Sequence, residues 1–191
     1  DIVDSAVALQ IKDSIALQEK STIKLIGTLC EIAEREKDTV MLGRTHGQAA
    51  VPITFGLKVA VWIDEMRRHL ERLRELRPRC ITGKFLGAVG TGAAQGERAL
   101  ELQDLVLEEL GLEVPVATTQ VVGRDRYIEW VGWMANVATT IEKILQEIRN
   151  LQRTEIGEVA EAFDSKKQVG SSTMAHKKNP ITSENACGLA R

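Results

Sequence analysis

The sequence predicts an all-α fold, a bundle of long helices, and three observations lead to this prediction. Apolar residues recur with a helical period over stretches much longer than a strand. Only 15 glycines and 4 prolines interrupt the 191 residues, and these residue types are the strongest breakers of regular structure. One stretch is apolar on two sides, as expected of a helix with neighbours on more than one face. We therefore expect long helices packed side by side.

The first predicted helix covers residues 2–35. Its apolar side chains recur at a period near 3.6 residues, and no proline interrupts them. They are Val7, Ile11, Ile15, Leu25, Leu29 and Ile32. A helix of this length spans about 50 Å at 1.5 Å per residue. Because this exceeds the width of a small domain, we expect it to pack along other long helices.

A short apolar stretch and a second helix follow. Residues 39–42 are consistent with a brief strand, which leads into a polar turn at 43–48. We expect Pro52 to open the second helix and Pro78 to end it, because proline fits the first turn of a helix and disrupts its interior. The predicted buried side of this helix carries Val59, Trp62, Ile63, Met66, Leu70, Leu73 and Leu76.

A segment rich in glycine and alanine, residues 83–96, separates the second helix from a third at 97–110. No adequate strand precedes this segment, and its glycine spacing does not fit a dinucleotide-binding fingerprint. Close packing of backbones near a site is the better interpretation. Gly111 and Pro115 should end the third helix.

The fourth predicted helix follows the polar stretch 118–126 and runs to about Gly157. It carries two apolar stripes, so we expect contacts with other subunits as well as with its own chain. One stripe holds Ile128, Val131, Ala135, Ala138, Ile141, Leu145, Ile148 and Leu151, and the other holds Trp130, Trp133, Val137 and Ile144. A last helix is expected at 181–190, begun by Pro180.

Composition excludes several classes of function. Hydrophobic residues make up 43% of the chain, charged residues make up 27%, and the net charge is −2, so nothing indicates nucleic-acid binding. No apolar run is long enough to span a bilayer, and no signal peptide opens the chain. Cys30, Cys80 and Cys187 stand alone, without disulfide or metal-ligand spacing. A reduced, cytoplasmic protein that binds no metal is the simplest interpretation.

Residues 170–180 concentrate the chemistry of the chain. Three hydroxyls, an imidazole, two ammonium groups and an amide lie between Gly170 and Pro180. A hydroxyl followed six residues later by a lysine suits a site that holds a carboxylate while a proton moves nearby. The segment resembles the signature loop of the fumarase/aspartase superfamily, GSSxMPxKxNP. It matches at Gly170, Ser171, Ser172, Met174, Lys177, Asn179 and Pro180, and it differs at Ala175, where the family has proline.

The three histidines differ in their surroundings. His46 lies in a turn between two glycines, and histidine is the natural proton carrier near neutral pH. His69 belongs to a charged helical face, so we expect it to be solvated. For His176, in the signature loop, a contact to substrate and a plain surface position are equally consistent with the sequence.

The sequence motif around His46 resembles that of one branch of the superfamily, the lyases that cleave adenylosuccinate. The resemblance rests on residues 43–48 and on the residues that follow them to Glu65. Other sequence motifs of this branch are matched by Thr119-Gln120, Arg124-Asp125-Arg126 and Ser183-Glu184. Even the first six residues are similar to the tail of the family's first region, so the resemblance covers essentially the whole chain.

The resemblance implies that residues 1–191 form the central helical domain of such an enzyme. This domain would build a multi-chain helical core in a homotetramer with shared active sites. The N-terminal and C-terminal domains of the family lie outside these residues, so we expect the isolated chain to be inactive. The implied reaction is the β-elimination of fumarate from adenylosuccinate and from succinyl-aminoimidazole-carboxamide ribotide, in purine nucleotide biosynthesis. It needs a small nucleotide substrate and no metal or organic cofactor.

The resemblance also implies roles for individual residues. Ser171 would be the general base, His46 the general acid, and Glu184 the partner that orients His46. Carried over in the same way, the substrate-binding residues would be Thr45, Gln120, Lys177, Asn179, Ser172 and Met174, together with Arg44 and Arg126, which either contact substrate or only brace the site. The polar residues 166–168 fit a lid-like loop.

Two alternatives remain open. Another lyase or cycloisomerase of the superfamily, acting on argininosuccinate or carboxymuconate, would share the signature loop. A non-enzymatic helical scaffold would share only the fold. Such a scaffold could lose Ser171, His46 or Lys177 without cost to folding, and all three are present. Fumarate release from each candidate substrate would distinguish these functions.

Overall fold

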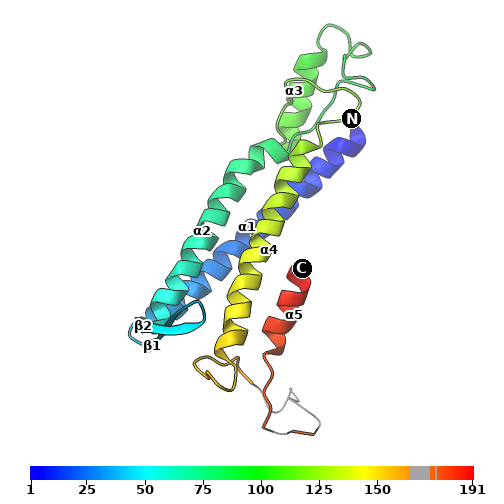
Figure 1. Ribbon diagram of the computed structural model, residues 1–191. Helices are drawn as coiled ribbons and strands as arrows, with labels where there is room; N and C mark the ends of the chain where they lie inside the picture. The colour runs from blue at the N-terminus through cyan, green and yellow to red at the C-terminus, as the bar shows by residue number, and fades with distance from the viewer. Residues whose placement is uncertain (164–172, 175) are drawn as a thin grey trace. The chain divides into compact units, whose positions relative to one another are not determined.

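The computed structural model describes residues 1–163, 173, 174 and 176–191. Within these residues the chain forms five helices and one antiparallel pair of strands (Figure 1). In chain order they are α1 (Ile2–Arg35), β1 (Val40–Thr45), β2 (Gln48–Thr54), α2 (Phe55–Cys80), α3 (Ala99–Leu110), α4 (Asp125–Leu151) and α5 (Ile181–Ala190). The predicted helical fold class is confirmed. The hairpin is a small addition at the place where the sequence indicated only a brief strand.

Two predictions about proline were wrong. Pro52 does not open α2 but lies in β2, opposite Leu42. Proline is tolerated there because both strands of a two-stranded sheet are edge strands, which need no second row of hydrogen bonds. Pro78 does not end α2, which continues to Cys80. The turn closes beyond the proline, since the N–H of Ile81 donates to the carbonyl of Arg77 at 3.1 Å.

The prediction that α4 runs to Gly157 was also wrong, because α4 ends at Leu151. The N–H groups of Glu158 and Val159 both donate to the carbonyl of Leu151, at 3.0 and 3.4 Å. Gly157 has a φ of +62°, a value that glycine adopts without strain. The apolar stripes end at Leu151 and a polar stretch follows, so no buried face extends the helix.

The contacts of the chain divide it into two compact units. The first comprises Asp1–Glu31 and Ile63–Met134. Its core is built from side chains of α1, α2, α3 and α4 and from the loops around α3. The most deeply buried apolar members are Ala8, Ile15, Met66, Leu73, Cys80, Leu107 and Val122. As predicted, Gly111 ends α3 in a left-handed conformation.

His69 lies in this core, and the expectation that it is solvated was wrong. Its residue is only 3% exposed, and its backbone carbonyl accepts a hydrogen bond from Trp133 Nε1 at 2.8 Å. The reason is helical spacing: His69 follows Met66 by three residues and precedes Leu73 by four, so it shares their buried face. The charged neighbours in the sequence point elsewhere on the helix.

The glycine-rich segment of this unit packs closely, as the sequence predicted. A Cβ atom added at Gly90 would lie 2.0 Å from the carbonyl oxygen of Thr118, and one added at Gly92 would lie 2.5 Å from Ala99 Cβ. Lys84, 1% exposed, donates from Nζ to the carboxylate of Asp1 at 2.6 Å and to the carbonyl of Gly87 at 2.7 Å. The segment is therefore a packed connection.

The second unit comprises Ile32–Trp62 and Ala135–Arg191. It contains the hairpin, the adjoining ends of α1 and α2, most of α4, and α5. Its buried apolar residues are Met41, Val59, Trp62, Ile144, Leu151 and Cys187. The motif residues around His46 and those described in the signature loop both belong to this unit.

Both apolar stripes predicted on α4 are buried in part, and the first stripe is exposed near its start but buried at Leu151, which is 2% exposed. Trp133 and Ile144, from the second stripe, are 6% and 7% exposed. Ile128 and Val131, from the first stripe, are 71% and 52% exposed. Within the described part of the chain, no helix is both long and apolar enough to cross a bilayer.

Candidate active site

The turn between β1 and β2 presents His46. Thr45 and Gln48 face each other in the hairpin, so His46 and Gly47 form a two-residue turn. Both have positive φ, +54° and +73°, as a type I′ turn requires. His46 is the one non-glycine residue with positive φ in the described part of the chain. The turn holds its side chain at an exposed tip.

An ion pair between Arg44 and Glu158 fixes the hairpin close to its turn. Arg44 donates from one terminal nitrogen to Glu158 Oε2 at 2.6 Å and from the other to Oε1 at 3.1 Å. The hydrogen bond to Glu158 raises the pKa of Arg44, and the same bond lowers the pKa of Glu158. The guanidinium that was expected to bind substrate or brace the site thus makes a bracing contact. Its binding to substrate stays a prediction.

The described end of the signature loop leads directly into α5. The N–H of Lys177 donates to the carbonyl of Met174 at 3.0 Å, which forms a turn. Pro180 caps α5 with a φ of −77°, and the N–H of Glu184 donates to its carbonyl at 2.9 Å. The prediction that Pro180 begins a helix is confirmed. Glu184 therefore lies in the first turn of α5.

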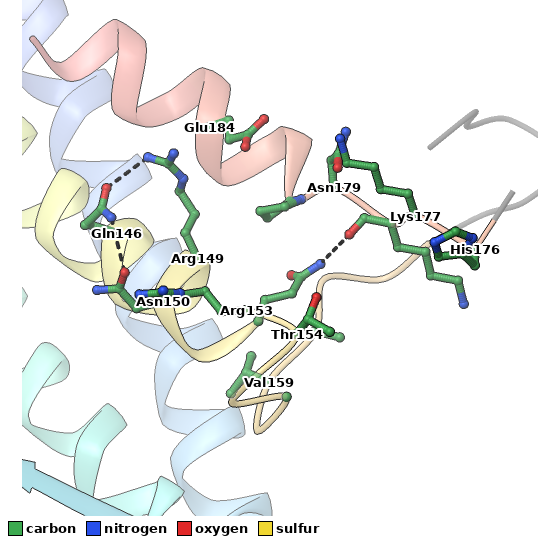
Figure 2. Close-up of a pocket in the computed structure, with 15 residues that line it drawn as sticks. Gln146, Arg149, Asn150, Arg153, Thr154, Val159, His176, Lys177, Asn179 and Glu184 are labelled. Carbon is green, nitrogen blue, oxygen red and sulfur yellow. Dashed lines mark hydrogen bonds between the residues drawn. The ribbon is translucent and has the colours of Figure 1, made fainter. Parts of the chain in front are cut away.

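Lys177, Asn179 and Glu184 line one pocket of about 710 Å³ (Figure 2). Its walls come from the end of α4, the turns that follow α4, the signature loop and the start of α5. The other lining residues are Gln146, Arg149, Asn150, Gln152, Arg153, Thr154, Gly157, Val159, Ala160, His176, Lys178 and Pro180. Two arginines and two lysines face a single carboxylate, so the pocket carries a clear excess of positive charge.

Sequence reasoning missed the wall that α4 contributes. Gln146, Arg149 and Asn150 recur at the spacing of one face of α4, and Arg153 continues this spacing just beyond the end of the helix at Leu151. Arg149 donates to Gln146 Oε1 at 2.9 Å, which orients its guanidinium (Figure 2). The signal was a polar stripe at the end of an otherwise apolar helix, with basic groups where the helix dipole favours them.

A second pocket, of about 370 Å³, lies beside the hairpin turn. Arg44, Gly47 and Lys58 line it together with Asn150 and Arg153. Because Asn150 and Arg153 also line the larger pocket, the end of α4 borders both. His46 lines neither of these two pockets, and its expected pairing with Glu184 stays a prediction.

The remaining candidate residues lie elsewhere. Gln120 and Arg126 belong to the first unit, where Arg126 donates to the carbonyl of Arg79 at 2.8 Å and to Thr82 Oγ1 at 3.0 Å. Met174 is exposed, and Thr45 is exposed in the hairpin. Ser171, Ser172, Ala175 and the stretch 166–168 lie outside the described residues. No group of acidic, histidine or cysteine side chains suited to a metal occurs among the residues that are described.

Comparison with known proteins identifies relatives along the full chain. A family model described as "Lyase" matches residues 1–191. The adenylosuccinate lyase of Pyrococcus abyssi is 54% identical over 191 residues, which are 100% of this chain and 42% of that protein. The chain thus spans less than half the length of this curated relative.

Solved structures show the same architecture. The fumarate lyase of Mesorhizobium sp. BNC1 matches with a TM-score of 0.86 and 38% identity, over 100% of this chain and 41% of that one. The 3-carboxy-cis,cis-muconate lactonizing enzyme of Pseudomonas putida matches with a TM-score of 0.88 and 37% identity, over 98% of this chain and 41% of that one.

Proposed function

We propose, because this chain belongs to the lyase family, that it is the central helical part of a carbon–nitrogen lyase. Its substrates would be adenylosuccinate and succinyl-aminoimidazole-carboxamide ribotide, from which it would eliminate fumarate. The observation that carries the proposal is the pocket in which Lys177 and Asn179 meet Arg149, Arg153 and Glu184.

The charge of this pocket suits the proposed substrates. Each substrate carries two carboxylates on its succinyl group and a phosphate on its ribose. Four cationic side chains against one carboxylate offer partners for several of these anions. Lys177 and Asn179 would hold the succinyl carboxylates, where negative charge grows in the transition state. Arg149 and Arg153, which form the opposite wall, are further candidates for anion binding.

The proposed chemistry has two proton transfers, one from the carbon next to the carbon that bears the nitrogen and one to the departing nitrogen. Ser171, as general base, takes a proton from the carbon beside a carboxylate. The electrons of that C–H bond form the double bond of fumarate as the C–N bond breaks. His46, as general acid, gives a proton to the departing nitrogen, and Glu184 orients the imidazole. Serine needs a field that favours its alkoxide, and Lys177, six residues further along the signature loop, would supply it.

We further propose that the active protein is a homotetramer whose sites combine several chains. Ile128 and Val131, the exposed residues near the start of the first α4 stripe, support this assembly because a partner would cover them. The exposed tip that carries His46 supports a shared site. In this proposal His46 of one chain works with Ser171 and Glu184 of another.

The alternatives fit less well. The adenylosuccinate lyase of Pyrococcus abyssi is 54% identical to this chain, whereas the muconate lactonizing enzyme is 37% identical. This difference in identity favours adenylosuccinate over carboxymuconate as the substrate. A scaffold would not need a cation-rich pocket beside the signature loop.

The test is turnover followed by absorbance: release of fumarate from the two succinyl substrates, and loss of carboxymuconate, which can form a lactone but cannot release fumarate. Because the chain spans 42% of its relative, the assay uses this chain joined to the flanking regions of a full-length relative, here termed the extended protein. Adenylosuccinate, argininosuccinate and carboxymuconate are supplied in parallel. We expect turnover of adenylosuccinate alone. Turnover of either other substrate at a higher kcat/KM, or of none, would overturn the proposal.

A further inference from the structure

The carboxylate of Glu161 caps the first turn of α5 from a distance of 22 residues along the chain. It accepts hydrogen bonds from the backbone N–H of Ser183 at 2.7 Å and of Thr182 at 3.2 Å. It also accepts a hydrogen bond from the hydroxyl of Ser183. The first N–H groups of a helix have no partner within the helix, and a carboxylate satisfies them with charge-assisted hydrogen bonds.

Gln152, just beyond the end of α4, joins the same network. Its side-chain oxygen accepts from the backbone N–H of Glu161 at 2.9 Å. Its side-chain nitrogen donates to the carbonyl of Lys178 at 3.2 Å, the bond drawn beside Lys177 in Figure 2. Gln152 thus ties the segment that enters the signature region to the segment that leaves it. We call Gln152 and Glu161 together the clamp.

The clamp acts on a helix that is already anchored on one side. Ser183 and Cys187, one turn apart on α5, are 2% and 1% exposed, so this face is packed. Burial acts to raise the pKa of Glu161, but the hydrogen bonds from Ser183 and Thr182 outweigh it and hold the pKa below its ordinary value. The carboxylate is therefore charged at neutral pH, the state in which it accepts all three bonds.

We propose that Glu161 is a positioning residue for the proposed elimination, because its cap on α5 sets where Glu184, Lys177 and Asn179 stand in the pocket. Glu184 directly follows Ser183 in the sequence, and Asn179 lies three residues before Thr182. Glu161 itself is not among the residues that line the pocket. This inference rests on the proposed function, since it assigns Glu161 a part in that same site.

A positioning role differs from a purely structural one in what it changes. If Glu161 only stabilised the fold, its loss would lower the melting temperature and leave the kinetics of the folded protein intact. If it aligns the pocket, its loss should impair the folded protein at temperatures far below melting. A misplacement of about 1 Å can cost about a hundredfold in rate.

The experiment compares Glu161→Gln with Glu155→Gln in the extended protein. Gln is nearly isosteric but accepts through one neutral oxygen and adds unwanted donors toward the N–H groups of α5. Glu155 lies in the same connection. Its side chain is 76% exposed, and its ion pair with Arg153, at 3.8 Å, is solvent-exposed and therefore weak, so its change is the matched control. Each variant is assayed with adenylosuccinate at a temperature where circular dichroism shows the parent helix content. Hydrogen exchange of the Thr182 and Ser183 amides is measured in parallel.

For Glu161→Gln we expect kcat to fall about tenfold to a hundredfold and KM to rise, because Glu184 and the carboxylate-binding residues shift together. The two amides should exchange at least about tenfold faster, and Glu155→Gln should match the parent in every measurement. Unchanged kinetics with faster exchange would show a cap without a positioning role and would overturn the inference. Unchanged exchange would overturn the clamp itself. If the unmodified extended protein released no fumarate, the proposed function would fall, while amide exchange would still decide whether the clamp exists.

Discussion

Replacing Gly56 by alanine should displace the hairpin that carries His46 from its position against the helices. Gly56 lies in the first turn of α2, directly after β2. Its N–H donates to the carbonyl of Glu36 at 2.9 Å, and the N–H of Phe55 donates to the carbonyl of Thr39 at 2.9 Å. These two bonds join the start of α2 to the turn that ends α1, so they fix the point where the hairpin leaves the helices.

The size of the effect follows from the space around Gly56. An added Cβ atom would lie 2.6 Å from the carbonyl oxygen of Ala33, 2.6 Å from Lys37 Cα and 2.8 Å from Lys37 N. All three neighbours are backbone atoms, so no side-chain rotation relieves the contact. The two segments would have to separate by about 0.8 Å to reach ordinary contact. Overpacking of this kind costs about 1–3 kcal/mol. The gain in helix propensity, at most about 1 kcal/mol, is offset by a weakened hydrogen bond to Glu36 of similar size.

Gly27→Ala is the matched control, because nothing lies within 4 Å of a Cβ atom added at Gly27 in α1. We expect this change to stabilise the chain by about 0.5–1 kcal/mol, and Gly56→Ala to destabilise it by about 1–3 kcal/mol. Urea unfolding of the 191-residue chain at one protein concentration measures both. In the extended protein, Gly56→Ala should also lower kcat, since His46 loses its fixed place. A Gly56→Ala chain as stable as Gly27→Ala would refute the reasoning.

Three further predictions test other parts of the account. Glu184→Gln should lower kcat strongly with a smaller change in KM, because orientation of His46 matters mainly as the proton moves; a raised KM with unchanged kcat would make Glu184 a binding residue. Mixing inactive His46→Ala and Ser171→Ala extended proteins should restore about a quarter of the sites by random assembly, and no recovery despite proven subunit exchange would place both residues in one chain. Cys80 should resist iodoacetamide at pH 8, because burial raises the pKa of its thiol to about 11 and leaves about one thiol in a thousand ionised. Cys30, which is exposed, is the internal control, and equal labelling of both would contradict the burial of Cys80.

Helical periodicity was the reliable part of the sequence. It predicted α1 closely and the stripe of α4 that contains Trp133 and Ile144, while glycine and proline positions predicted the end of α3 and the start of α5. The sequence-based predictions were wrong where another feature of the chain competes with the helical period of apolar residues. For Pro52, the pairing with Leu42 in the hairpin decided the structure. For His69, three charged neighbours hid its spacing from Met66 and Leu73.

The candidate site was predictable where it is local in sequence. The turn at His46 and the start of α5 at Pro180 both depend on neighbouring residues, and both were foreseen. The clamp was not foreseen, because Glu161 and Ser183 are 22 residues apart and no short pattern records their contact. The cationic wall of Arg149 and Arg153 was missed because it continues a helix whose apolar stripes dominated the interpretation.

The most direct test of the account is the fate of adenylosuccinate in the extended protein and in its Ser171→Ala variant. The account predicts that the parent releases fumarate and the free amino nucleotide in equal amounts. The variant should still bind adenylosuccinate, since Lys177 and Asn179 remain. Its kcat should fall at least about a hundredfold because the general base is absent. A variant that keeps more than about a tenth of the parent kcat would contradict the assignment of Ser171. A parent that leaves adenylosuccinate intact would contradict the proposed function.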